Sequence, residues 1–405
     1  MTGEKQEKRP DQQSVDPDNP RIDKVRASRD GHAFHEAWAA RSALALLPPD
    51  AALTAIAIEG FDLEDEAMLG KAAVEVADLV RYYGGNRIED ADRTEVVQFK
   101  YSIAKQADPL VASDLAKTLE KFATSDVNSR RDHGDKIAER VHYEFATNRP
   151  ISADLRAAIA GIATGAELEA GAAAQASTLR AALGRVPEAR TDVLERLTMS
   201  GSLGSLSESR DRVGDQIASW GVPSDPQSRI RLRELQHLVR TKAEHAAQRD
   251  KLITRVTMLA TFEIQDEDEL YPSPDAFPDV STPIHRPIVD DIVEKARSTT
   301  LPILLVGEGG MGKTVLMQAI AEKLGENNQV VLFDGFGAGT WRDPARPRHL
   351  ASRTLVHLAN LLAARGLNDI QLPSYQEDAL LRSFRTRLEQ AVATVREQDA
   401  DAAVV

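Results

Sequence analysis

The stretch LPILLVGEGGMGKTVLMQAI, residues 301–320, decides the fold of the C-terminal part of this chain. Within it, GEGGMGKT at 307–314 fits the phosphate-loop pattern G-x-x-x-x-G-K-[ST] at every defined position. The apolar run at 303–306 predicts a buried strand before the loop. The apolar spacing of VLMQAI at 315–320 predicts a helix after it. This strand–loop–helix order is the context that a nucleotide-binding loop needs.

Each residue type in the loop has a physical reason. Glycines let backbone N–H groups turn inward around phosphates, and the start of the helix adds a partial positive charge. Lys313 is expected to reach the β- and γ-phosphates, and Thr314 to present its hydroxyl to Mg²⁺. We therefore expect ATP and Mg²⁺ as cofactors. The predicted cofactor-binding residues are Gly307, Gly309, Gly310, Gly312, Lys313 and Thr314.

The segment around the loop alternates helix and strand from residue 286 onward, which predicts a parallel α/β sheet. QVVLFDGFGAG (329–339) is the expected second strand, and DAAVV (401–405) looks like the opening of another core strand. A nucleotide hydrolase needs a carboxylate at the end of such a strand to hold Mg²⁺ and water. The sequence ends before one appears, so we expect 286–405 to be the N-terminal part of a P-loop NTPase domain. ATP binding is expected, and ATP hydrolysis by this chain is left open.

A second α/β pattern occupies residues 31–152. Apolar spacing of three to four residues predicts its helices, and runs of apolar and β-branched residues predict its strands. A short acidic helix is also expected near 63–71. The main expected elements are a helix over 32–47, strands over 52–60, 72–83 and 94–102, a helix over 111–123, and a strand over 141–152.

This part of the chain holds a candidate metal centre. The strand period of two places Gln98 and Lys100 on one face, and a hairpin would bring Asp78 beside them. Asp78 and the Gln98 carbonyl could supply oxygen ligands to Mg²⁺, and Glu36 could add a second carboxylate. Lys100 could orient the attacking water or stabilise phosphate charge. Together these four residues could catalyse metal-assisted phosphodiester hydrolysis. The competing interpretation is a half-buried sheet whose polar residues face solvent.

Two histidines precede Glu36. His32 and His35 could suggest a metal site, but no third ligand has the matching spacing. We interpret them as polar residues near the start of a helix.

Composition excludes several classes of protein. The 405 residues include 63 acidic and 50 basic ones, giving a net charge of −13, which argues against a surface coated with basic residues. With no cysteine, the chain has no disulfide, zinc finger, iron–sulfur cluster or thiol nucleophile. No secretory signal is visible, and no apolar run approaches the ~20 residues of a membrane span. We therefore expect a cytoplasmic protein without membrane contact.

The remaining segments complete the expected layout. Residues 1–30 are rich in charge, Pro and Asp and predict a disordered tail. Residues 153–270 predict a helical region, in which the basic stretch 229–255 is read as a solvated face rather than a nucleic-acid contact. The Pro-, Ser- and Asp-rich segment 271–285 predicts a linker.

These patterns resemble known families. RPIVDDIVEKARSTTLPILLVGEGGMGKTVL (286–316) is similar to the start of a STAND NTPase, a signal-transduction ATPase with numerous domains. ADLVRYY (77–83) and VVQFKYS (96–102) resemble the catalytic strands of a PD-(D/E)xK nuclease in its QxK form, and YEFATNRPI (143–151) resembles the strand that closes that core. The combination resembles the N-terminal part of an antiviral STAND protein of the Avs type.

That resemblance implies a restriction-endonuclease-like core, a helical middle and a partial NTPase domain. It further implies an antiphage effector that binds ATP and cleaves double-stranded DNA once homo-oligomerisation activates it. A phage protein would be the trigger, sensed by a C-terminal region that this sequence lacks. Gln98 departs from the acidic residue of the family pattern, which removes one negative charge from the metal site. The alternative is a nucleotide-switched scaffold or regulator whose N-terminal domain binds DNA or partners without cleaving.

Overall fold

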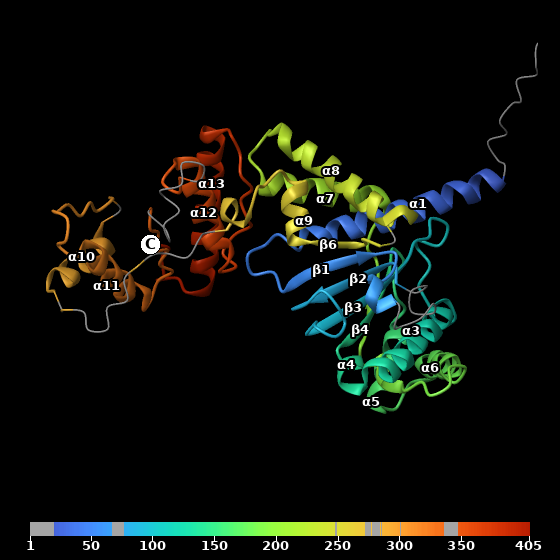
Figure 1. Cartoon of the computed structure of the whole chain (residues 1–405). Coiled ribbons are helices and arrows are strands. Elements are labelled where there is room, and N and C mark those ends of the chain that lie inside the picture. The colour runs from blue at the N-terminus through green and yellow to red at the C-terminus, as the bar shows by residue number, and fades with distance from the viewer. Residues whose placement is uncertain are drawn as a thin grey trace, which may run out of the picture.

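The computed structural model of the chain is shown in Figure 1. It describes residues 20–66, 77–247, 249–271, 277, 284, 286–299, 301–335 and 347–405.

A six-stranded mixed sheet forms the core of the N-terminal part, with the strand order β5-β4-β3-β2-β1-β6. The pairs β1–β2, β2–β3 and β1–β6 are antiparallel, whereas β3–β4 and β4–β5 are parallel. The parallel β3–β4 pair requires a crossover, which the helix α3 supplies. The strands are β1 (Leu53–Ile58), β2 (Leu79–Tyr83), β3 (Arg93–Lys100), β4 (Val141–Thr147), β5 (Leu197–Ser200) and β6 (Leu252–Thr254).

Helices cover both faces of this sheet (Figure 1). Val96 of β3 packs in the cluster beneath α3 and α6, whereas its neighbours Val97 and Phe99 pack toward α1. This alternation is the period-two pattern of a strand buried on both faces. The helices of one face are α1 (Pro20–Leu44), α7 (Leu206–Trp220), α8 (Pro226–Ala243) and α9 (Arg255–Thr261), and those of the other are α3 (Ala112–His133), α4 (Asp135–Ala138), α5 (Ala153–Thr164) and α6 (Ala170–Leu183).

Two expectations about this part are corrected. The segment 153–270 is not purely helical, because it also supplies β5 and β6. These strands have four and three residues, too few for a periodic signal, and pairing with β4 and β1 creates them. The expected tail over 1–30 is wrong from Pro20 onward, where α1 begins, and residues 1–19 lie outside the described residues.

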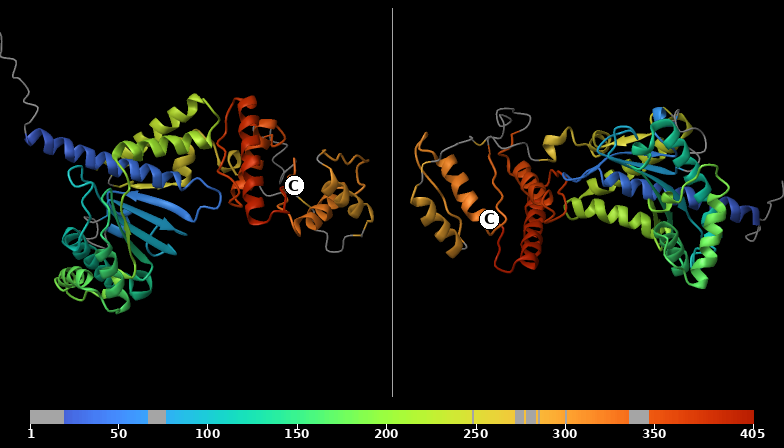
Figure 2. Two further views of the ribbon diagram at one scale, coloured as in Figure 1. Left: turned by 180° about the vertical axis from the view of Figure 1, so that it is seen from behind. Right: turned by 90° about the horizontal axis from the view of Figure 1, so that it is seen from below.

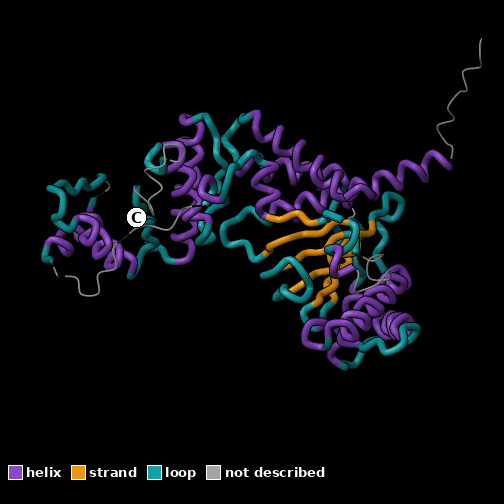
Figure 3. Tube along the Cα trace, in the orientation of Figure 1, coloured by secondary structure: helices purple, strands orange, loops and turns teal. Residues whose placement is uncertain are grey.

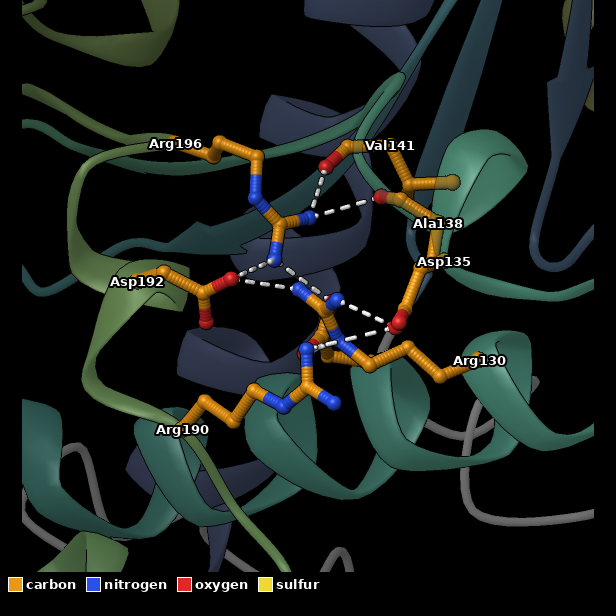
Figure 4. Close-up of polar contacts among 8 residues, drawn as sticks. Arg130, Asp135, Ala138, Val141, Arg190, Asp192 and Arg196 are labelled. Atoms are coloured by element: carbon orange, nitrogen blue, oxygen red, sulfur yellow. Dashed lines mark hydrogen bonds and ion pairs between the residues drawn. The ribbon is translucent and has the colours of Figure 1, made fainter.

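Buried ion pairs fasten β4 and β5 to α3 (Figure 4). The guanidinium of Arg196 donates to the carbonyl of Val141 at 2.6 Å and lies 2.6 Å from the carboxylate of Asp126. Arg130 lies 2.9 Å from the other oxygen of Asp126 and 2.5 Å from Asp192. The neighbouring carboxylates raise the pKa of Arg130 against the opposing effect of burial. The network fixes the crossover on which the parallel strands depend.

The C-terminal part contains α10 (Ile288–Ser298), α11 (Lys313–Gly325), α12 (Ala351–Ala363) and α13 (Glu377–Gln398). The predicted buried strand over 303–306 is wrong: the segment is drawn as loop in Figure 3, and Leu304 and Val306 are 84% and 85% exposed. Within the described residues no strand pairs with this segment, and Leu305 packs against the cluster formed by α10 and α11.

The other two expected strands of this part meet each other. Gln329 and Val404 form a parallel bridge, in which the N–H of Gln329 donates to Ala403 at 2.8 Å and that of Val405 to Gln329 at 2.9 Å. The parallel pairing is therefore seen at this bridge, although neither segment forms a regular strand. Part of 329–339 lies outside the described residues.

In both views of Figure 2, α12 and α13 lie between the sheet-containing part and the pair α10–α11.

The predicted linker 271–285 is described only at 271, 277 and 284. Of the short helix predicted near 63–71, residues 63–66 are helical and the rest lie outside the described residues. None of the described helices is long and apolar enough to cross a membrane.

Candidate functional site

The first candidate centre lies at one end of the sheet, where β1 and β3 end and β2 begins. The β2–β3 register ends with Leu79 paired to Val97, and Asp78 is the residue before β2. The backbone N–H of Asp78 donates to the carbonyl of the same Val97 at 3.0 Å, so the ladder is irregular at this step. The side-chain amide of Gln98 donates to the Asp78 carboxylate. The hairpin thus brings Asp78 and Gln98 together, as predicted from the strand spacing.

The carboxylate of Asp78 is half-buried, with its side chain 13% exposed, and is hydrogen-bonded through one oxygen. Its Oδ2 accepts from the backbone N–H of Phe99 at 2.6 Å and from the side-chain amide of Gln98. Burial raises the pKa of Asp78, and nearby Glu59 acts in the same direction, whereas His35 and the two donors oppose the shift. Its Oδ1 has no partner among the described residues, so this oxygen is free to bind another group.

Lys100 lies two residues beyond Gln98 at the end of β3, and the pleat therefore places both on one face. Its side chain is exposed and makes no hydrogen bond or ion pair with the described residues. An exposed ammonium on the face of β3 that also carries Gln98 can attract a phosphate group.

Two residues that sequence reasoning did not assign join this centre. His35 of α1 lies with Nε2 3.9 Å from Asp78 Oδ2 and with Nδ1 3.9 Å from Glu59 Oε1. Its ring centroid is 5.3 Å from that of Phe99, which holds the imidazole against the sheet. The sequence pattern alone indicates for His35 only a polar residue near the start of a helix. The sequence feature that could have identified Glu59 is its position at the end of the apolar strand segment, directly before Gly60.

Glu36 does not belong to this centre, which corrects the prediction. Its Oε2 lies 3.3 Å from Arg240 of α8, on the side of α1 that packs on other helices. Successive residues of a helix point about 100° apart. Because His35 faces the sheet end, Glu36 faces away from it.

The donor set is consistent with a divalent cation that prefers oxygen ligands. It offers the Oδ1 atom of Asp78 and the Gln98 amide, which presents oxygen or nitrogen according to its rotation. The Nδ1 atom of His35 is buried without a hydrogen-bond partner, so the polar groups here are incompletely satisfied. No group of three or more His, Asp or Glu side chains able to hold a metal occurs among the described residues.

The second candidate centre is the glycine-rich loop before α11. Gly310 and Gly312 have φ angles of 79° and 72°, in the left-handed region that favours glycine. Among the described residues, the backbone N–H groups of 308–312 have no hydrogen-bond acceptor. A loop with unsatisfied N–H groups ahead of a helix is suited to bind phosphate.

The side chains around this loop are also suited to bind a phosphate group. Lys313 Nζ donates to the carbonyls of Gly307 and Glu308, each at 2.7 Å, so the ammonium curls over the loop. Thr314 is exposed at the first turn of α11. Arg286, which sequence reasoning did not single out, donates to the carbonyl of Met311 at 2.9 Å. The loop geometry and the donor set fit a nucleoside triphosphate.

Comparisons with known proteins leave the chain without an assigned family. No family model matches it, and no curated protein does so. Two solved structures of the Cap4 SAVED/CARF-domain receptor of Acinetobacter baumannii have a TM-score of 0.32. The first, with the cyclic trinucleotide 2'3'3'-cAAA, is 14% identical and matches 62% of this chain and 50% of that one. The second is 12% identical and matches 82% and 67%. At this TM-score the likeness carries no argument about function, which rests on the residues themselves.

Proposed function

We propose that the chain is an ATP-binding antiphage effector that cleaves double-stranded DNA by cation-dependent phosphodiester hydrolysis. The observation that carries the nuclease proposal is the cross-strand pair of Asp78 and Gln98, with Lys100 two residues farther along the same strand. The strand order supports it: three antiparallel strands, a crossover helix and a parallel fourth strand match the order expected of the PD-(D/E)xK core.

The residues would divide the chemistry among them. A bound Mg²⁺ ion would supply positive charge to the scissile phosphate and its attacking water. Asp78 would hold the ion through its carboxylate, and the Gln98 amide would contribute its oxygen after rotation. Lys100 would stabilise the charge that develops on the phosphate or orient the water.

The glycine-rich loop would regulate the nuclease by binding ATP. Lys313 and Thr314 would bind ATP and its Mg²⁺, and ATP would favour an assembled homo-oligomer that brings nuclease centres together on duplex DNA. A phage protein would act through a sensor region outside this sequence. The net charge of −13 suits an effector whose lone subunit binds DNA weakly.

A plasmid-nicking assay with Mg²⁺ and ATP tests the nuclease. Asp78→Asn and Lys100→Ala should each slow nicking by at least about 100-fold, because Asp78 would hold the ion and Lys100 would act on the phosphate or the water. Lys105→Ala is the matched control, since Lys105 is also an exposed lysine but lies in the loop after β3. Equal nicking by all four proteins, or none by the wild type, would contradict the proposal.

A second function is favoured by one observation. The Gln98 amide already donates to Asp78, so the carboxylate is partly satisfied without any ion. This arrangement suits a nucleotide-switched regulator or scaffold that binds DNA or partners without cleaving. A gel shift of duplex DNA in the absence of nicking would support this second function.

A further inference from the structure

We propose that Glu59 supplies the second carboxylate of the cation centre, the role that the sequence pattern assigned to Glu36. This inference rests on the proposed nuclease function and extends its site by one ligand. Glu59 follows β1 directly, which places it at the same end of the sheet as Asp78.

The strand register places Glu59 in a row with the other two ligands. The β1–β2 pairs include Ile58 with Leu79, so the next step pairs Glu59 with Asp78. The N–H of Glu59 donates to the carbonyl of Asp78 at 3.0 Å, which confirms this step. Asp78 in turn accepts a hydrogen bond from the side-chain amide of Gln98. Directly opposed residues have Cα atoms about 4.5–5.5 Å apart, so three oxygen-bearing side chains begin on adjacent strands.

The backbone at Glu59 is held in an unusual turn. Its φ angle is 53°, in the left-handed region that is uncommon for a residue with a side chain. Lys251 Nζ donates to the Glu59 carbonyl at 3.1 Å and fixes this turn. The next residue, Gly60, has a φ angle of 133°, at which a residue with a side chain would be strained.

The charges around the centre favour a cation between Glu59 and Asp78. The Glu59 side chain is 41% exposed, so a hydrated ion could reach it. Its carboxylate lies 3.9 Å from Nδ1 of His35, and Lys251 contacts Glu59 through the backbone carbonyl. Glu66, another carboxylate near this turn, is paired with Lys251 and is therefore neutralised. Among the described residues, the side-chain carboxylates of Glu59 and Asp78 have His35 as their ion-pair partner, and a divalent ion would supply further positive charge.

Mn²⁺ binding to the full chain, freed of metal and nucleotide, tests the inference by isothermal titration calorimetry at one pH. Glu59→Gln should weaken Mn²⁺ binding by at least about tenfold, since it removes a charged ligand. Asp78→Asn should weaken it at least as much. Glu36→Gln is the matched control and should bind as the wild type does, because Glu36 faces Arg240. Circular dichroism verifies that each variant is folded.

The outcomes separate this inference from the proposed function. Wild-type affinity in Glu59→Gln with weak binding in Asp78→Asn would overturn the role of Glu59 and leave the nuclease centre standing. Wild-type affinity in Asp78→Asn, or no Mn²⁺ binding by the wild type, would overturn the centre itself. A loss in Glu36→Gln equal to that in Glu59→Gln would also reject the inference, because Glu36 lies outside the row.

Discussion

Individual side chains carry both proposed chemistries, and their environments make them testable. Asp78 is half-buried beside a single imidazole, whereas Lys100 is exposed and unpaired among the described residues. At the loop, Lys313 contacts only backbone carbonyls in the described part of the chain, so its charge is available to a phosphate. These three residues correspond to the positions that the sequence singled out.

Replacing Lys313 tests nucleotide binding at the residue scale. Lys313→Ala should weaken ATP binding by about ten- to hundredfold, because a hydrogen bond to a charged group contributes about 1.5–3 kcal/mol. Isothermal titration calorimetry provides the measurement. Lys323→Ala is a matched control on the same helix, where Lys323 pairs with Asp290. Undiminished ATP binding by Lys313→Ala would show that the loop is not used in this way.

A buried acid predicts how stability depends on pH. Asp65 is 2% exposed, and its carboxylate accepts from Tyr82 Oη at 2.9 Å and from the N–H of Ile88 at 3.2 Å. Burial raises the pKa of Asp65 from 3.8 to about 6, against the effect of both donors. The folded state therefore holds this proton more tightly than the unfolded state does.

The sign of the effect follows from that difference. The free energy of unfolding should fall as pH rises from about 4 to about 6, by up to about 3 kcal/mol from this group. Asp65→Asn should flatten this part of the curve, measured by urea unfolding at several pH values. The difference between the two curves isolates Asp65, since the other titrating groups are common to both proteins. Parallel curves would contradict the assignment.

At the scale of elements, the sheet is begun by the longer strands with a periodic sequence. Short strands and buried ion pairs complete it. The four residues of β5 pair with β4, whose position depends on the network of Arg196, Arg130 and Asp126 (Figure 4). Arg196 and Asp126 are 9% and 1% exposed, so solvent screens their attraction little.

Breaking this network should be costly. Arg196→Met should lower the free energy of unfolding by about 3–5 kcal/mol, because it leaves a buried carboxylate with less compensation. Arg185→Met, which removes an arginine 67% exposed and paired with Glu120, should change it by no more than about 1 kcal/mol. Urea unfolding compares the two. Similar losses in both variants would mean that the network does not fasten β5.

At the scale of the whole molecule, a buried polar interface joins the sheet-containing part to α12 and α13. Gln371 is fully buried and donates to the carbonyl of Trp220, at the end of α7, at 3.2 Å. Its Oε1 accepts from Ser383 of α13 at 2.7 Å. Arg387 donates to the carbonyl of Ser219 at 2.7 Å, and burial lowers the pKa of Arg387 to about 10. Since α7 also packs on α1, this interface lies between the two candidate centres.

Removing one member of the interface should loosen it. Gln371→Leu leaves Ser383 and the Trp220 carbonyl without this partner, which should cost about 1–3 kcal/mol. Hydrogen exchange should then be faster in α12 and α13, while the central strands of the sheet keep their protection. Gln376→Leu, at an exposed position, is the control. Unchanged exchange in Gln371→Leu would show that the interface does not depend on this side chain.

The local sequence pattern was enough to predict those features whose determining residues lie next to one another in the chain. The loop at 307–314 is one such feature, because its glycines and lysine act within one turn of backbone. The core strands β1, β3 and β4 are others, since runs of apolar and β-branched side chains are local properties of the sequence.

Tertiary structure decided which side chains meet. His35 rather than Glu36 faces the sheet end because α1 has one rotation against the sheet, and Glu59 lies opposite Asp78 because of the β1–β2 register. Strands β5 and β6 exist because longer neighbours supply their hydrogen bonds. The rotation of a helix and the register of strands depend on packing between residues far apart in sequence, which no local spacing encodes.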